Sequence, residues 1–258
     1  MRLALGLEYD GAVFHGWQTQ PGGRTLQDAL EAALTRVAAH PVATVCAGRT
    51  DAGVHATAQV VHFDTFSQRP LTAWVRGVNA HLPAAMAVRW AAVVPDDFHA
   101  RFSARSRTYQ YWLLVDPVRP ALLSQRVGWV FRPLDLEAMQ AAALLLEGTH
   151  DFSAFRAAEC QAASPVRNLH TCLVERRGRF VRFQFRANAF LHHMVRNLVG
   201  SLIYVGLGRR SPEWIGEVLA ARERSRAAPT FAAAGLYLSG VEYDAALTLP
   251  GGGVTPFE

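Results

Sequence analysis

The stretch Ala47-Gly48-Arg49-Thr50-Asp51-Ala52-Gly53-Val54-His55-Ala56 places one carboxylate between two glycines and beside an arginine. It follows Pro41 to Cys46, which is short and contains β-branched residues, and it precedes Gln59 to Asp64, in which apolar and polar residues alternate. Both flanks are typical of β-strands, the second of a half-buried one. Glycines allow tight turns and close backbone approaches. We therefore expect a tightly folded loop between two strands, and the rest of the fold is built outward from it.

Asp51 is the candidate catalytic residue of this loop. Its neighbour Arg49 would favour the ionised form of the carboxylate and could also bind a phosphate group. The alternative is a structural role, in which Asp51 closes an Asx-turn and Arg49 forms a surface ion pair. An Asp-x-Gly loop taken alone favours the structural role, so the choice depends on the rest of the chain.

The composition indicates a folded protein with a polyanionic partner. Half of the 258 residues are hydrophobic, enough for one large core or two modest ones, which excludes a disordered chain. No run reaches the ~18 consecutive apolar residues of a membrane span, and no apolar run follows a basic start, so we expect a soluble, cytoplasmic protein without a membrane segment. All 26 basic residues are arginine, and the formal net charge is +5. The absence of lysine excludes Schiff-base catalysis and the lysine of a P-loop.

The three cysteines, Cys46, Cys160 and Cys172, are odd in number and widely spaced. This spacing fits a reducing compartment better than a disulfide framework.

The first half of the chain has the pattern of an α+β unit. Alternation predicts strands over Arg2 to Tyr9 and over Met86 to Val94. Apolar residues recur at helical spacing from Leu26 to Ala39, with Thr25 as the N-cap, and a shorter helix is expected over Leu71 to Asn79.

The same pattern begins again near residue 104, with a strand from Ser106 and a helix over Leu134 to Leu146. Later expected elements are a hairpin of two strands, two helices, an alanine-rich linker and a last strand: Leu169 to Glu175, Arg179 to Ala187, Leu191 to Leu202, Pro212 to Ala221, Ala227 to Ala234 and Leu236 to Tyr243. In the strand from Arg179, Arg182 and Arg186 alternate with phenylalanines, so one face of the sheet is expected to be basic.

This organisation predicts two α+β halves that resemble RRM or ferredoxin-like units. Residues 1–103 carry the aspartate loop, residues 104–245 form the second half, and residues 246–258 are expected to be a flexible tail. Side by side, the halves would make one extended, mainly antiparallel sheet with helices on one face and a cleft on the other.

Residues 48–56, Gly-Arg-Thr-Asp-Ala-Gly-Val-His-Ala, resemble the signature of the TruA family of tRNA pseudouridine synthases. Three further segments resemble the same family in the same order: Tyr9-Asp10-Gly11 with Phe14-His15-Gly16-Trp17-Gln18, Phe190-Leu191-His192-His193-Met194-Val195-Arg196-Asn197-Leu198-Val199-Gly200, and Gly235-Leu236-Tyr237-Leu238. The resemblance covers nearly the whole chain and implies the pseudouridine synthase fold, with an RNA-binding cleft on the sheet face opposite the helices.

The resemblance also assigns roles to three residues. Asp51 matches the catalytic aspartate. Arg196 falls outside the apolar stripe of its predicted helix, and the resemblance makes it the partner that keeps Asp51 ionised; otherwise it would be a solvated helix residue. Tyr109 matches a tyrosine that stacks on the flipped base and is a candidate for removing the C5 proton. Leu236 would be an apolar wall of the pocket, or simply a core leucine.

Substrate contacts are expected from arginines and aromatic residues, because single-stranded RNA is bound through phosphates and stacked bases. Arg101, Arg105 and Arg107 are interleaved with aromatic residues between Phe98 and Trp112, although an ordinary strand with solvated arginines has the same composition. By resemblance, segments at Phe98 to Phe102 and Glu159 to Ala163 influence the choice of uridine. The residues expected to bind substrate are Tyr109, Arg49, Leu236, Phe98, His99, Arg101, Phe102, Arg182 and His192.

The family isomerises uridines 38, 39 and 40 of the anticodon stem-loop of tRNA, acts as a homodimer and needs no cofactor. We expect no metal site, because His192 and His193 as adjacent helical residues would point about 100° apart. Two alternatives remain: a catalytically silent RNA-binding protein, and a zinc-dependent deaminase, whose His-x-Glu and Pro-Cys-x-x-Cys motifs are missing. The sequence leaves open which tRNAs are used, whether Asp51 attacks as a nucleophile or acts as a base, the dimer contacts and any growth-temperature optimum.

Overall fold

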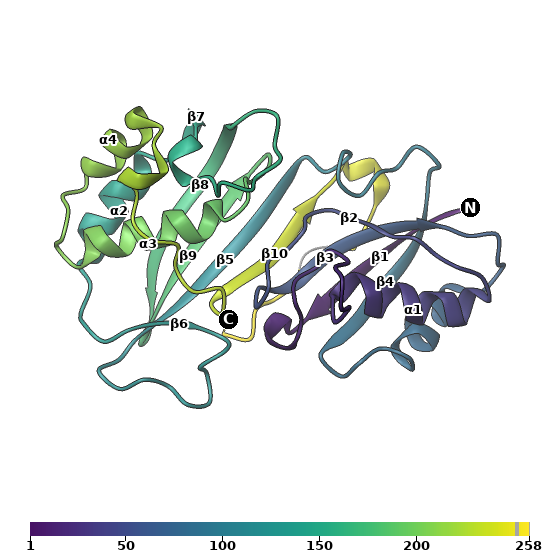
Figure 1. The fold of residues 1–258 in the computed structure, drawn as a ribbon. Coiled ribbons are helices and arrows are strands. Elements are labelled where there is room, and N and C mark those ends of the chain that lie inside the picture. Colours follow the sequence, from purple (N-terminus) through teal and green to yellow (C-terminus); the bar gives the residue numbers. More distant parts are fainter. Residues whose placement is uncertain (251–252, 258) are drawn as a thin grey trace. The chain divides into compact units, whose positions relative to one another are not determined.

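The computed structural model describes residues 1–250 and 253–257, which fold as two compact units. Unit 1 comprises residues 1–107 and 237–258, and unit 2 comprises residues 108–236. Both units combine a mainly antiparallel sheet with helices, so the predicted α+β class is confirmed (Figure 1). The predicted division at residues 103 and 245 stays a prediction, and the predicted tail includes Gly251, Gly252 and Glu258, which lie outside the described residues.

The sheet of unit 1 has the strand order β4-β1-β3-β10, with the short β2 paired to β3. Its strands are β1 (Arg2–Tyr9), β2 (Val45–Cys46), β3 (His55–Asp64), β4 (Met86–Val94) and β10 (Leu236–Glu242). β1 is antiparallel to both β3 and β4, whereas β10 is parallel to β3 with Tyr237 opposite His55.

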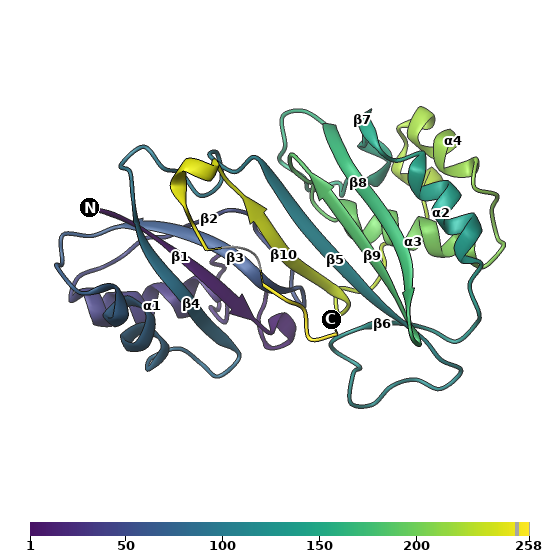
Figure 2. The ribbon, with the colours of Figure 1, turned by 180° about the vertical axis from the view of Figure 1, so that it is seen from behind.

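One helix and several helical turns complete unit 1. They are α1 (Leu26–Ala38), a π-helical turn (Ala73–Gly77) and two 3-10 turns (Gly11–Val13 and Ala245–Leu247). The α1 helix begins where predicted, because the Thr25 side chain accepts a hydrogen bond from the Asp28 amide. The helix lies in front of the sheet of this unit in Figure 1 and behind it in Figure 2. Its buried face includes Leu26, Leu30 and Leu34.

Strand β3 differs from the predicted half-buried strand. Residues 59–63 are all buried, on both faces of the sheet. Phe63 packs against Trp74 of the π-helical turn, with ring centroids 5.3 Å apart. On the other face a second cluster joins Val60 to Phe98 and Ala100, with Tyr243 packed against it. Alternation of apolar and polar residues therefore does not mark a solvated face here, because a later segment of the chain covers it.

The sheet of unit 2 has the order β5-β9-β8-β7, with β6 paired to β5. Its strands are β5 (Ser106–Val115, whose first two residues belong to unit 1), β6 (Gly128–Val130), β7 (Gly148–Asp151), β8 (Val166–Arg177) and β9 (Phe180–Ala187). β8 and β9 form the predicted hairpin, and Gly178 in its turn has a positive φ of 59°.

Helices of unit 2 lie on one side of its strands, as Figures 1 and 2 show from opposite directions. They are α2 (Leu136–Leu144), α3 (Met194–Gly206) and α4 (Trp214–Ala221), with 3-10 turns at Ser153–Phe155 and Arg224–Arg226. α2 packs against β8 and α3. Among the described residues, no helix is long and apolar enough to cross a membrane. Cys46, Cys160 and Cys172 are free and buried.

Helix α3 begins three residues later than predicted. His193 is the N-cap of this helix, with φ 61°, so His192 and His193 are not consecutive helical residues. The prediction that their side chains point about 100° apart, which was the reason for expecting no metal site, therefore rested on a wrong helix start. The backbone of His192 is engaged elsewhere: its carbonyl accepts from the Ala157 amide at 3.0 Å, and its amide donates to Cys160 Sγ at 3.5 Å. These contacts with a distant segment prevent the helix from extending further toward its N-terminus.

Candidate active site

Asp51 lies in the loop between β2 and β3 of unit 1, as predicted. Its side chain is half-buried, and its carbonyl accepts a hydrogen bond from the Val54 amide at 3.1 Å. The loop starts from Ala47, whose amide donates to the Val60 carbonyl at 2.8 Å. In the middle of the loop, the Thr50 carbonyl accepts from the Trp17 amide at 2.9 Å. The backbone on both sides of Asp51 is therefore fixed.

Hydrogen bonds among buried polar side chains hold this loop against strands β1 and β3. Gln59 is fully buried, and its side-chain amide donates to the Gly48 carbonyl at 2.6 Å and to the Tyr9 hydroxyl at 3.3 Å. The Tyr9 hydroxyl and the Thr50 hydroxyl lie 2.8 Å apart and share a hydrogen bond. The Gln59 side-chain oxygen accepts from the Gly48 amide at 3.4 Å. Buried hydrogen bonds of this kind fix a single loop conformation.

The segment that follows β1 closes the far side of the loop. Gly11 lies so close to the loop that an added Cβ would sit 1.9 Å from the Val54 carbonyl oxygen. The Gly11 amide donates to Nδ1 of His55 at 3.1 Å, and the same ring nitrogen lies 3.1 Å from the Asp10 carboxylate. Gly16, with φ 85°, packs on the backbone of Thr50. The two sequence motifs at residues 9–18 and 48–56 therefore form one structural unit.

Arg49 is placed differently from the expectation. Its side chain is exposed, and within the described part of the chain it has neither a hydrogen bond nor an ion pair. No hydrogen bond or ion pair among the described residues joins Arg49 to the Asp51 carboxylate, so the expected effect of Arg49 on this carboxylate stays a prediction. An exposed guanidinium at this position is available for a phosphate group.

Arg196 lies on α3 of unit 2 and is half-buried between fully buried neighbours. Its Nε donates to the Phe231 carbonyl at 2.8 Å, and its own carbonyl accepts from the Phe231 amide at 3.2 Å. The next residue, Asn197, is fully buried and donates to the Phe155 carbonyl at 2.8 Å. Thr230 donates to the Asn197 side chain at 2.7 Å. The guanidinium is thus anchored through Nε to the Phe231 carbonyl, and buried hydrogen bonds of Asn197 fix the next residue of the helix.

The predicted alanine-rich linker ties α3 to β5. Besides the bonds to Arg196, the Ala232 carbonyl accepts from the Tyr111 hydroxyl at 3.0 Å, and the Gly235 carbonyl accepts from the Trp112 amide at 2.9 Å. A Cβ on Gly235 would lie 2.5 Å from the Trp112 carbonyl oxygen. Small residues are needed here because the backbones approach closely, so the segment is an ordered strap and not a linker.

Tyr109 is buried on β5, with its ring perpendicular to that of Phe190 at a centroid distance of 5.1 Å. Tyr109 shares a strand face with Tyr111, which contacts Phe183 on the buried face of β9. Arg182 alternates with Phe183 and therefore lies on the opposite face, where it forms an ion pair with Glu175. Unit 2 does not bring Arg182 and Tyr109 to the same face.

The segment at residues 98–102 contains one residue of the hydrophobic core and, beside it, an exposed aromatic ring that stacks on a histidine and an arginine. Phe98 is buried and packs against Tyr243 at 5.1 Å. Phe102 is 74% exposed; its ring stacks on His99 at 4.3 Å and lies below the Arg101 guanidinium at 5.4 Å. Of the four residues predicted here, His99, Arg101 and Phe102 are available to a ligand and Phe98 is not.

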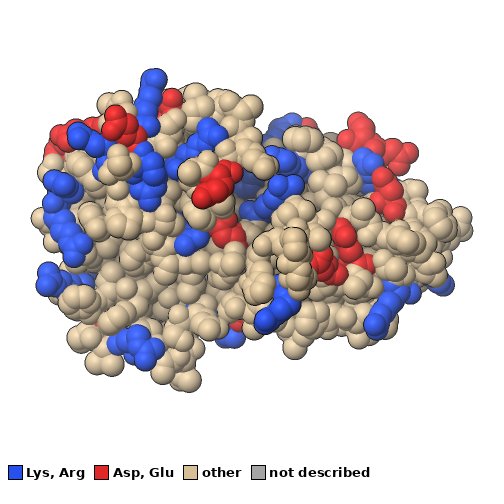
Figure 3. All heavy atoms as spheres, viewed as in Figure 1, with Lys and Arg blue, Asp and Glu red and all other residues tan. Residues whose placement is uncertain are grey.

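The two remaining predicted residues also belong to unit 2. Leu236 is buried at the first position of β10, and His192 is exposed just before α3. On the face of this unit that Figure 3 shows, arginine side chains are spread apart, with acidic groups among them.

Sequence reasoning missed the polar residues that support the site. Gln59 and Asn197 are buried in otherwise apolar elements, and Thr50 and Tyr9 complete the network beside Asp51. A polar residue within an apolar strand or helix is the signal that could have found the first two, since such residues need buried partners.

The fold and the anchored aspartate loop agree with one family of RNA-modifying enzymes. A family model described as tRNA pseudouridine synthase matches residues 7–103 and 142–244, and the chain belongs to this family. The family identifies it as an isomerase.

The chain is also similar to curated proteins over nearly its full length. It is 64% identical over 253 residues to tRNA pseudouridine synthase A of Aromatoleum aromaticum, covering 98% of this chain and 96% of that protein. It is 61% identical over 250 residues to tRNA pseudouridine synthase A of Dechloromonas aromatica, covering 97% and 95%. For the protein of the same name from Thiobacillus denitrificans the identity is 59% over 250 residues, covering 97% and 96%. The resemblance found in the sequence motifs is confirmed.

Proposed function

We propose that this chain isomerises uridines 38, 39 and 40 in the anticodon stem-loop of tRNA to pseudouridine. The observation that carries the proposal is the aspartate loop at residues 47–54, which buried hydrogen bonds hold in one conformation within the segment matched by the family model. A rigidly supported carboxylate is what a reaction at one sugar carbon requires. The positions 38 to 40 rest on the motif resemblance.

The reaction conserves every atom of the nucleotide. The bond between N1 and C1′ breaks, the base rotates, and C5 bonds to C1′. C5 then loses its proton and N1 gains one, so no oxidant, reductant or cofactor is consumed. Asp51 either attacks as a nucleophile or removes a proton to open a glycal route.

Two residues of unit 2 complete the proposed chemistry. Arg196 supplies the positive charge that keeps the catalytic carboxylate ionised, and its fixed guanidinium supports this role. Tyr109 stacks on the flipped base and accepts the C5 proton. Leu236 provides an apolar wall.

Substrate binding in this proposal uses exposed cationic and aromatic side chains. Arg49, Arg101 and Phe102 are exposed, which supports contacts with phosphates and unpaired bases. Arg182 and His192 would extend this surface in unit 2. The target uridine must leave its helix, and phosphate contacts offset the free energy of unstacking.

The proposed positions are tested by mapping pseudouridine in tRNA transcripts after incubation with the purified protein. Chemical labelling of pseudouridine followed by primer extension should give stops one nucleotide 3′ of positions 38 to 40, and transcripts with cytidine at those positions should give none. Pseudouridine in another arm would contradict the proposed specificity while leaving the isomerase activity intact.

We further propose a cytoplasmic homodimer. Light scattering of the purified protein should then give about twice the chain mass of 28.3 kDa. A monomer at micromolar concentration that is fully active would contradict this proposal.

A further inference from the structure

Arg107 is a buried arginine that the proposed mechanism does not use. The sequence pattern grouped it with Arg101 and Arg105 as a phosphate contact. The residue is only 8% exposed, however, and its guanidinium donates to backbone carbonyls of the protein, so it does not offer that contact. Burying a guanidinium is costly unless its donors find partners, and a buried charge in a strand therefore needs a structural or functional reason.

The hydrogen bonds of Arg107 join two segments of unit 1. Its Nε and Nη2 donate to the carbonyl of Ala47 at 3.3 and 3.0 Å. Its Nη1 donates to the Ala104 carbonyl at 3.2 Å, and Nη2 also donates to the Arg101 carbonyl. Ala47 is the first residue of the Asp51 loop. The other two carbonyls belong to the segment that presents Arg101 and Phe102.

Apolar packing reinforces the same connection. Ala47 is buried in one cluster with Phe98 and Ala100, directly before the exposed residues 101 and 102. The start of the Asp51 loop and the segment at residues 98–104 therefore contact one another through side chains as well as through Arg107.

We infer that Arg107 is a positioning residue for Asp51, and this inference rests on the proposed function. Gln59 and Tyr9 support the middle of the loop, the Gly11 segment closes its far end, and Arg107 fixes its first residue. Arg107 reaches the three carbonyls from three separate nitrogens of one planar, forked guanidinium, whereas a lysine carries all its N–H donors on a single nitrogen and cannot span them in the same way. Loss of the fork should let the loop move, and a misplacement of about 1 Å can lower a rate by about 100-fold.

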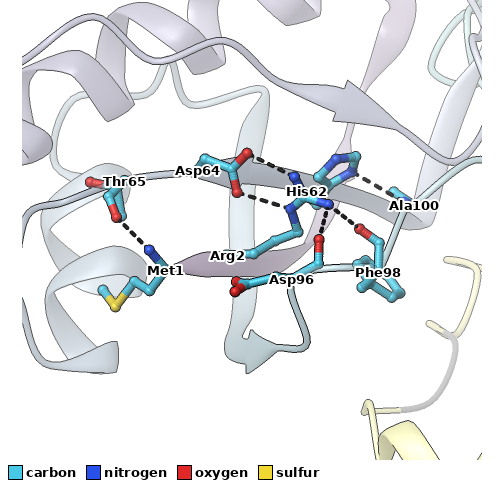
Figure 4. Close-up of polar contacts among 8 residues, drawn as sticks. All are labelled: Met1, Arg2, His62, Asp64, Thr65, Asp96, Phe98 and Ala100. Carbon is cyan, nitrogen blue, oxygen red and sulfur yellow. Dashed lines mark hydrogen bonds and ion pairs between the residues drawn. The ribbon is translucent and has the colours of Figure 1, made fainter.

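Arg2 offers a matched control within the same unit (Figure 4). Its Nη1 donates to the carbonyls of Asp96 and Phe98 at 2.6 and 2.9 Å, and its other donors bind the Asp64 carboxylate at 2.9 and 2.8 Å. Arg2 is thus a second arginine that fixes backbone carbonyls of residues 96–104. None of its described hydrogen bonds reaches residues 47–54. Substituting Arg2 removes a comparable set of contacts without releasing the Asp51 loop.

The test compares wild type, Arg107→Lys, Arg2→Lys and Asp51→Asn in single-turnover pseudouridine formation. Varying the protein concentration separates the maximal rate from the half-saturating concentration. We expect Arg107→Lys to lower the maximal rate about 10- to 100-fold with less than a threefold change in half-saturation. Arg2→Lys should keep the maximal rate within about twofold of wild type. Equal maximal rates for the two lysine variants would overturn the inference.

Hydrogen exchange of amides 48–54 in the folded protein at low temperature provides a second readout. Relative to the amides of β1 in the same variant, these amides should exchange faster in Arg107→Lys than in Arg2→Lys. Global destabilisation alone would accelerate amides 48–54 and those of β1 together in Arg107→Lys, and this result would overturn the inference. The measurement needs only a folded population, so it applies even if Arg107→Lys is less stable. If wild type forms no pseudouridine, the proposed function fails; if it does and only the comparison of Arg107 with Arg2 fails, the inference alone is wrong.

Discussion

Replacing Gln59 by leucine should both destabilise the protein and slow the reaction. Gln59 is fully buried, donates to Gly48 and Tyr9, and accepts from the amides of Gly48 and Val60 at 3.4 and 3.2 Å. A buried hydrogen bond contributes about 1 kcal/mol net, and a partner left unsatisfied costs about 1–3 kcal/mol. The Gly48 carbonyl, bonded at 2.6 Å, would lose this partner. We expect a loss of about 2–4 kcal/mol in the free energy of unfolding.

Urea unfolding measures this loss, and single-turnover pseudouridine formation measures the effect on the loop. The rate should fall about tenfold or more, because Gly48 lies three residues from Asp51. Tyr9→Phe is the matched control, since it keeps the ring, removes the hydroxyl bonds to Gln59 and Thr50 and should cost about 1 kcal/mol. If Gln59→Leu stays within about 0.5 kcal/mol of wild type and keeps the full rate, the network does not hold the loop.

Three further outcomes follow from the structure. Gly11→Ala should lower the melting temperature and the activity, because the new Cβ would lie 1.9 Å from the Val54 carbonyl oxygen. Gly216→Ala in helix α4 is the contrasting case: no atom lies within 4 Å of the new Cβ, so this substitution should stabilise the protein by about 0.5–1 kcal/mol. Burial and the nearby Arg2 charge lower the pKa of His62 to about 4. The unfolded chain therefore binds the extra proton first as the pH falls from 6.5 to 4, and stability should decrease over that range by about 1–2 kcal/mol more in wild type than in His62→Asn after allowance for solvent screening. Burial raises the thiol pKa of Cys46 and Cys172, whereas at Cys160 hydrogen bonds from backbone amides and a nearby arginine outweigh burial and lower the thiol pKa. Iodoacetamide should therefore modify Cys160 first. Mass spectrometry that finds Cys46 or Cys172 labelled earlier would contradict this prediction.

Elements fixed by local pattern were predictable. The strands at residues 2–9 and 86–94 have the predicted bounds, because alternation and flanking turn residues determine them locally. The start of α1 followed from Thr25 and Asp28, since a cap needs only residues three positions apart. The position of Asp51 in a loop followed from the glycines and the two flanking strands.

Features that depend on distant segments were not predictable. Helix α3 starts at Met194 because Ala157 and Cys160 bind the backbone of His192, which no periodicity in residues 191–202 reveals. The predicted linker at residues 227–234 is a strap because its carbonyls meet Arg196 and Tyr111.

Residue types in the candidate site were easier to predict than their orientations. Arg49 is exposed and Arg107 is buried, although the sequence pattern offered each as a possible phosphate contact. Alternation alone could not reveal that Phe98 enters a second core, since the residues that cover it come from the other end of the chain. Long-range packing decides which of several similar side chains reaches a ligand.

The most direct measurement is tritium release from tRNA labelled at C5 of uridine, because the proposed isomerisation replaces the C5 proton by a bond to C1′. Wild type and Asp51→Asn should be compared at protein concentrations that give equal tRNA binding. We predict stoichiometric release by wild type and none by Asp51→Asn. Release by both proteins at the same rate would remove Asp51 from the chemistry, and binding without release by wild type would mean that the chain only binds RNA.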